Sequence, residues 1–240
     1  MLSNGGRRDH FQTTLLASFL CLLFSSCGLP TYIYLYSPAD FSASANQLSL
    51  TNNSNNYDSS EGLTQSFKGY ELFYRAYSSQ TSADTMSTAL INKASIYSSD
   101  PDSFMSYANS AGFFRVRLLG SDGAPTDSTP LLSISAAKAQ SDDTYYFNLE
   151  PNSDWLLSDG TTSQTICRSV ADSTRCGFYK KANFLASSGD ADYTGTDSPS
   201  TLYFVFFAVA FGTDSSTPWM TVYSAPSLLS GGVVPYTPGS

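Results

Sequence analysis

The stretch FKGYELFYRAY, residues 67–77, predicts a β-strand and decides the fold class. Side chains alternate between the two faces of a strand, so one face carries Tyr70, Leu72, Tyr74 and Ala76. We expect this face to pack in a hydrophobic core, because large apolar and aromatic side chains are mostly buried. A platform on which sugars or bases stack is the alternative interpretation of the same residues.

Further strand patterns lie on both sides of this stretch. The long apolar run LYFVFFAVAFG at 202–212 is expected to be buried on both faces or nearly so. Shorter strands are predicted at 47–52, 113–119, 131–135, 144–149, 165–168, 176–180 and 219–226. Many short strands separated by turn residues are typical of a sandwich of two antiparallel sheets.

Two short helices interrupt the strand patterns. Apolar residues recur every three or four positions over 82–97, and Ser82 is placed to cap the helix. Asp100 followed by Pro101 predicts the cap and first turn of a second helix, which Gly112 ends.

The two longest strand patterns together resemble a fibronectin type III domain. The third strand of that domain reads Gly-Tyr-x-Val-x-Tyr-Arg, and its places are taken here by Gly69, Tyr70, Leu72, Tyr74 and Arg75. The final hairpin of that domain is matched by Tyr203, Val205, Phe207, Ala210, Ser224 and Pro226. The resemblance implies a mainly β, fibronectin type III/immunoglobulin-like sandwich over 47–229. An insertion at roughly 78–200 then holds the helices and a cysteine hairpin, and 230–240 is a Gly/Pro-rich tail.

The first residues predict an export signal. Arg7 and Arg8 precede an apolar run over 11–26, which ends in small residues before Cys27. The run is shorter than the roughly 20 apolar residues that a transmembrane helix needs, which disfavours a permanent span. An ordinary secretory signal cut near Ser26 is the alternative.

Phe24-Ser25-Ser26-Cys27 resembles a bacterial lipobox, in its relaxed form that is found in spirochaete lipoproteins. The usual leucine is replaced by Phe24. The resemblance implies that 1–26 is removed, that Cys27 carries lipid, and that 27–46 is a lipidated tether leading into a first strand. The protein is then attached to the inner or outer membrane of a bacterial cell envelope, on the periplasmic side or the outer surface.

The remaining cysteines predict a disulfide. Cys21 is removed with the signal, and Cys167 and Cys176 flank the polar segment RSVADSTR, as in a stapled hairpin. Disulfides persist in exported proteins, so we expect a bond between these two. Two cysteines without histidine partners make a zinc site a poor alternative.

Charge and histidine content exclude several function classes. The formal charge is −8 for the whole chain and −9 without residues 1–26, so no basic surface for nucleic acid is expected. The single histidine, His10, lies in the signal, which leaves no histidine for a Ser-His-Asp triad or a metal site. No cofactor is expected.

One acidic loop and a few carboxylates are the remaining site candidates. Asp190, Asp192 and Thr194 are spaced like the start of an EF-hand calcium loop, but Thr201 stands where that loop has a glutamate. A solvated acidic loop is the preferred interpretation. Glu71 is one candidate member of a catalytic carboxylate pair.

Glu150 is a further scarce glutamate, but no spacing pairs it with Glu71. Trp155 and Trp219 are expected to pack in the core or at an edge, with stacking on sugars as the alternative. The sequence therefore favours a non-enzymatic, lipid-anchored envelope protein with a protein partner or a structural or adhesion role. The alternative is a module that binds carbohydrate or another small ligand.

Overall fold

The computed structural model describes residues 33–44, 46–57, 66–126, 130–170, 175–184, 186–193, 199–214 and 220–239. The chain divides into two units, Met1–Tyr32 and Ile33–Ser240, and all described residues belong to the second. The predicted signal and Cys27 therefore lie outside the described residues. The described part is mainly β, with two antiparallel sheets, as the sequence predicts.

The first sheet has six strands within the described residues. Their order is β1 (Asp40–Ser44), β2 (Gln47–Thr51), β7 (Thr144–Asn148), β8 (Leu156–Ser158), β9 (Ser163–Cys167) and β5 (Arg117–Leu118). Each strand pairs antiparallel with its neighbour. Four of these strands, β5 and β7 to β9, come from the region that the resemblance treats as an insertion, so part of that region builds the first sheet itself.

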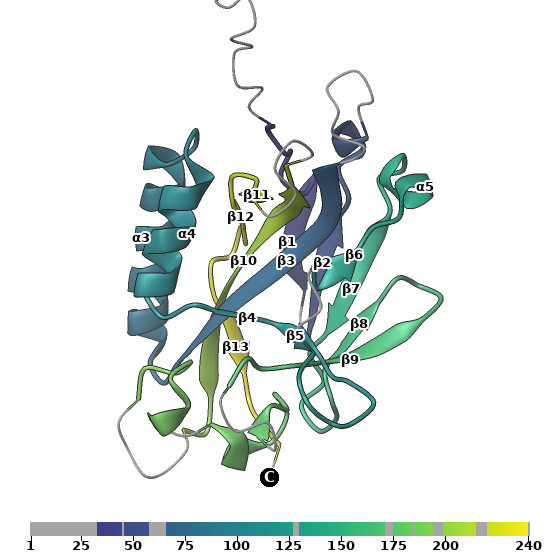
Figure 1. The fold of residues 1–240 in the computed structure, drawn as a ribbon. Coiled ribbons are helices and arrows are strands. Elements are labelled where there is room, and N and C mark those ends of the chain that lie inside the picture. The colour runs from purple at the N-terminus through teal and green to yellow at the C-terminus, as the bar shows by residue number, and fades with distance from the viewer. Residues whose placement is uncertain are drawn as a thin grey trace, which may run out of the picture. The chain divides into compact units, whose positions relative to one another are not determined.

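The second sheet is centred on the two longest strands, β3 (Phe67–Tyr77) and β10 (Leu202–Thr213) (Figure 1). They pair antiparallel from Tyr203 opposite Tyr77 to Gly212 opposite Phe67, with one bulge. In the part of the chain that the structure describes, five shorter strands join them: β11 (Thr221–Tyr223), β12 (Ser227–Leu228) and β13 (Val234–Tyr236) on β10, and β4 (Phe114–Arg115) and β6 (Leu132–Ser133) on β3. Gly69 permits the β6 contact, because a Cβ there would overlap the Leu132 carbonyl.

The hydrophobic core between the sheets confirms the prediction that one face of the strand at 67–77, which is β3, is buried. All four residues of its aromatic face, Tyr70, Leu72, Tyr74 and Ala76, are at most 1% exposed. They belong to one cluster with inward-facing residues of β1, β2, β7 and β8. The aromatic stripe is therefore part of the core and is not available as a stacking platform.

Two helices cover the outer face of the β3–β10 pair: α3 (Gln80–Ile96) and α4 (Pro101–Ser110) (Figure 1). Leu90 of α3 and Phe104 of α4 share a second cluster with Phe73 and Phe207. One face of β10 packs in the core between the sheets and the other packs against these helices, so both faces of β10 are apolar. Asp100 caps α4, as predicted, by accepting a hydrogen bond from the Ser103 backbone N–H.

The first helix starts earlier than predicted, and the other helical elements are short. Residue Ser79, not Ser82, is the N-cap of α3. The remaining helical elements of the described ranges are α5 (Ala136–Ala139) and three turns of 3₁₀-helix, at Ser54–Asn56, Lys181–Asn183 and Ala186–Ser188.

Three strand predictions differ from the structure. The stretch 113–119 is divided between the sheets, since β4 joins β3 and β5 joins β9. Between them the Val116 N–H donates to the Leu72 carbonyl as the chain crosses over. Residues 176–180 form no strand and contribute only an isolated bridge from Lys180 to Gly239. The Gly/Pro-rich tail contains β13, which is part of the second sheet.

The predicted disulfide is not present. Cys167 and Cys176 are both free and buried, and they lie 3.5 Å apart, well beyond the roughly 2.05 Å of an S–S bond. A backbone hydrogen bond of 2.6 Å from the Arg168 N–H to the Cys176 carbonyl joins the two segments. Contact with Cys176 and burial raise the pKa of the Cys167 thiol, which keeps its proton.

Candidate functional site

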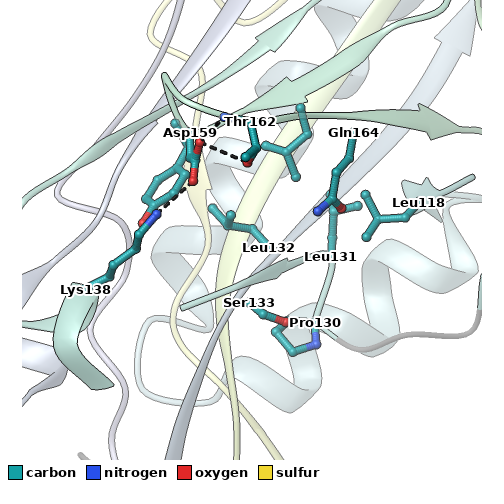
Figure 2. Close-up of a pocket in the computed structure, with 11 residues that line it drawn as sticks. Leu118, Pro130, Leu131, Leu132, Ser133, Lys138, Asp159, Thr162 and Gln164 are labelled. Carbon is teal, nitrogen blue, oxygen red and sulfur yellow. Dashed lines mark hydrogen bonds and ion pairs between the residues drawn. The ribbon is translucent and has the colours of Figure 1, made fainter. Parts of the chain in front are cut away.

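A cleft of about 250 Å³ lies between the two sheets, beside the short helix α5 (Figure 2). Its wall is formed by residues of β5, β6, β7, β8 and β9, of α5 and of the β8–β9 turn. The eleven lining residues are Leu118, Pro130, Leu131, Leu132, Ser133, Lys138, Tyr145, Leu157, Asp159, Thr162 and Gln164. Segments far apart in the sequence thus meet at one place.

The cleft has a mixed lining, of which one part is aliphatic. Leu131, Leu132 and Leu157 are between 3% and 7% exposed, and Pro130 is also buried. All three leucines belong to the core cluster between the sheets, so the cleft opens onto the edge of that core. When an apolar group binds in the cleft, its own apolar surface and the apolar surface of the cleft both lose contact with water.

A polar group lies at one end of the cleft, where Figure 2 shows Lys138 beside Asp159. Lys138 Nζ and Asp159 Oδ2 form an ion pair at 2.8 Å between α5 and the β8–β9 turn. The other oxygen, Oδ1, accepts from the Thr161 and Thr162 backbone N–H groups at 2.9 and 2.7 Å. The Lys138 bond and these amides hold the pKa of Asp159 far below its usual range, so the carboxylate stays ionised.

Tyr145, on β7, supplies the unusual group of the cleft. Its side chain is 2% exposed, and its hydroxyl has no hydrogen-bond partner among the described residues. Buried polar atoms are almost always paired, so an unpaired hydroxyl at a cavity wall indicates a place for a ligand or water. Burial raises the pKa of Tyr145, and the group is therefore a neutral hydroxyl that can donate or accept.

A smaller cavity of about 180 Å³ adjoins the two thiols. Cys167, Cys176, Asp154 and Lys180 are among its lining residues. Within the described residues no group of three or more His, Cys, Asp or Glu side chains is placed to hold a metal ion.

Asp190, the first member of the predicted calcium loop, instead lies in the core. Both of its oxygens bond the buried Arg168 guanidinium, at 2.6 and 2.7 Å. Tyr74 and Ser188 donate their hydroxyls to it at 2.6 and 2.7 Å. Arg168 therefore supplies the positive charge that a cation would supply, and this arrangement gives Asp190 no free oxygen for calcium.

The other two members of that loop do not complete a site in the described residues. Asp192 is half-buried and accepts from the Ser78 backbone N–H at 2.9 Å. Thr194 lies outside the described residues.

The candidate catalytic glutamates lie on different sheets. Glu71, on β3, is 1% exposed and pairs with Arg115 at 2.9 Å. Burial raises the pKa of Glu71 to about 7, although the charge of Arg115 acts in the opposite direction. Glu150 is exposed and follows β7 of the other sheet.

The aromatic residues considered for sugar stacking are not free where they are described. Trp155 is 1% exposed and stacks on Phe178, with 4.1 Å between ring centroids. Trp219 lies outside the described residues.

The sequence did not single out the residues of the cleft. Lys138, Tyr145 and Asp159 lie in ordinary turn and strand patterns, and their convergence depends on the pairing of β7 with β8. The only local signal is SDGTT at 158–162, in which Asp159 organises the turn.

Comparison with known proteins adds no family. No protein-family model matches the sequence, and neither a curated protein nor a solved structure is significantly similar to it. No helix in the described ranges is long and apolar enough to cross a membrane. The functional conclusion therefore depends on the residues and their geometry.

Proposed function

We propose that this chain is a non-enzymatic lipoprotein of a bacterial cell envelope, attached through lipid on Cys27. The observation that carries the proposal is the order of the N-terminal features: Arg7 and Arg8, the apolar run 11–26, then Cys27 after two serines. The compact unit begins at Ile33, a few residues after this cysteine. Such an arrangement suits a domain held close to a membrane surface.

We propose further that the domain is a fibronectin type III/immunoglobulin-like sandwich. The order β11-β10-β3 in the second sheet supports this identity, because those sandwiches place their strands G, F and C side by side in one sheet, although here two further short strands, β12 and β13, follow β11 and also pair with β10. Ser224 adds a local contact, since its hydroxyl accepts from the Ala210 N–H at 2.8 Å. Both residues belong to the hairpin motif that carries the sequence resemblance.

The domain's role is to present a protein-binding or structural surface. The tight aromatic core supports this choice over carbohydrate binding, since Trp155 and the aromatic face of β3 are packed inside. Glu71 lies buried on β3 of one sheet, whereas Glu150 is exposed in the segment that follows β7 of the other, and this supports a non-enzymatic role because glycoside hydrolysis needs two carboxyls facing each other.

The anchor is tested by detergent partition of the chain expressed in a bacterium with lipoprotein processing. The wild-type protein and Cys21→Ser are expected in the detergent phase, because Cys21 leaves with the signal. Cys27→Ser is expected in the aqueous phase, with slower signal removal. A Cys27→Ser protein that still enters the detergent phase contradicts the proposal. Protease treatment of intact cells then separates a surface location from a periplasmic one.

A further inference from the structure

We infer that the cleft beside α5 binds a small, uncharged amphipathic molecule: an aliphatic or aromatic body that carries one hydroxyl, carbonyl or amide group. The juxtaposition behind this inference is a cavity with leucines in one part of its lining and with Tyr145 beside them, whose buried hydroxyl has no hydrogen-bond partner among the described residues. The inference is independent of the lipid anchor.

The size of the cleft limits the ligand. Its volume of about 250 Å³ lies just below the roughly 300–1,000 Å³ of pockets that hold drug-sized molecules. The occupant is therefore a molecule no larger than an amino acid or a single ring with a substituent. A protein partner could place at most a side chain there.

The aliphatic part of the mixed lining favours an apolar group on the ligand. Leu131, Leu132, Leu157 and Pro130 are aliphatic and buried, and Leu118 completes this surface. A sugar ring prefers the flat face of an aromatic side chain together with many polar groups. The only aromatic residue in the lining is Tyr145, so this cleft does not have the composition of a sugar site.

The charges select a neutral ligand. Lys138 and Asp159 are bonded to each other at 2.8 Å, and each offsets the field of the other in the cleft. A ligand carboxylate that approaches Lys138 would also approach the like charge of Asp159. A ligand ammonium group that approaches Asp159 would likewise approach the like charge of Lys138. A charged ligand therefore loses water on entering the cleft without gaining an unpaired opposite charge that would offset the cost of that loss.

The Tyr145 hydroxyl supplies the specific contact. It is an unpaired donor and acceptor that the neighbouring side chains close off from solvent, so a small shift of those side chains on binding lets a hydroxyl, carbonyl or amide of the ligand supply the hydrogen bond that this group lacks among the described residues. Gln164 and Thr162 are exposed polar residues of the same lining and can bond the outer side of that polar group.

The test uses four probes that share a six-membered ring: cyclohexanol, cyclohexanecarboxylate, cyclohexylammonium and glucose. The full chain with Cys27→Ser is labelled with ¹⁵N, so the result does not depend on lipidation, and amide shifts are followed by NMR. Cyclohexanol is expected to give saturable shifts at the amides of Leu132, Thr162 and Gln164, with millimolar affinity for so small a ligand. The two charged probes and glucose are expected to bind at least tenfold more weakly.

Two matched variants test the role of the hydroxyl. Tyr145→Phe keeps the ring and should weaken cyclohexanol binding roughly three- to tenfold, as expected for one lost hydrogen bond. Tyr146→Phe removes the hydroxyl of the next residue, which is 37% exposed and absent from the lining, and should leave binding unchanged. Tyr145→Phe should fold, because it removes an unpaired polar atom. Shifts that do not saturate or lie elsewhere, equal binding of the charged probes, or unchanged binding in Tyr145→Phe would overturn the inference.

Discussion

Replacement of Asp190 by alanine tests the buried ion pair between Asp190 and Arg168. The Asp190 and Arg168 side chains are both 0% exposed, and two charged hydrogen bonds of 2.6 and 2.7 Å join them. In Asp190→Ala the guanidinium keeps its charge. It retains the Asn183 carbonyl, to which it donates at 2.5 Å, and the Phe184 ring 4.1 Å away. Its counter-charge is lost.

The expected loss follows from the cost of an unpaired buried charge. Removal of one member of a buried ion pair typically lowers the free energy of unfolding by about 3–5 kcal/mol. Tyr74 also loses the acceptor of its 2.6 Å hydrogen bond. For a domain of this size each 1 kcal/mol lowers the melting temperature by roughly 2–4 °C, so we expect a decrease of roughly 6–20 °C.

The assay is thermal unfolding followed by circular dichroism, with two control variants. Asp192→Ala lies two residues away, where a half-buried carboxylate accepts from Ser78, and should change stability by less than about 1 kcal/mol. The double variant Arg168→Met with Asp190→Ala should recover part of the loss, because it leaves no unpaired charge. An Asp190→Ala protein that melts with the wild type would refute this account.

Calcium and pH distinguish this interpretation from a metal site. Burial acts to raise the pKa of Asp190, but the hydrogen bonds and charge of Arg168 outweigh it and leave that pKa lowered. The pair therefore stabilises the fold above the unfolded carboxyl pKa of about 4, and this stabilisation is lost as pH falls through the folded pKa. Added calcium should not raise the melting temperature of the wild-type protein.

Three further predictions concern other parts of the domain. The pKa of Glu71 is about 7 in the folded state against 4.5 for a free side chain, so its ionisation should cost about 3 kcal/mol as pH rises from about 4.5 to 7. Urea unfolding of Glu71→Gln at pH 5 and pH 8 should show a flatter pH dependence than the wild type, and an unchanged slope would contradict the shift. Trp155→Ala should lower the free energy of unfolding by about 3–5 kcal/mol, measured by thermal melting, because it empties a core site against Phe178. Cys167 and Cys176 should react with a thiol reagent only after denaturation, since both are buried, and joined peptides in non-reducing mass spectrometry would disprove the free thiols.

The success of sequence-based prediction differed between long and short elements. The strand at 67–77 has the predicted bounds because its alternation continues over eleven residues. The helix that starts at Pro101 was also predictable, because Asp100 provides a local cap signal. In contrast, β8 and β13 contain three residues each, too few to show a period, and their pairing with distant strands creates them.

The sequence by itself determined the mainly β class and the identity of the strands and helices with long patterns, and it also predicts an export signal. These properties depend on residues that are neighbours along the chain, so local spacing contains them. Only the tertiary structure decided that Asp190 bonds Arg168 in the core, that the two thiols are free, and that Lys138, Tyr145 and Asp159 meet at one cleft. Each of these depends on which strands pair and which side chains lose water, and contacts between residues far apart in sequence are decided by the packing of the whole domain.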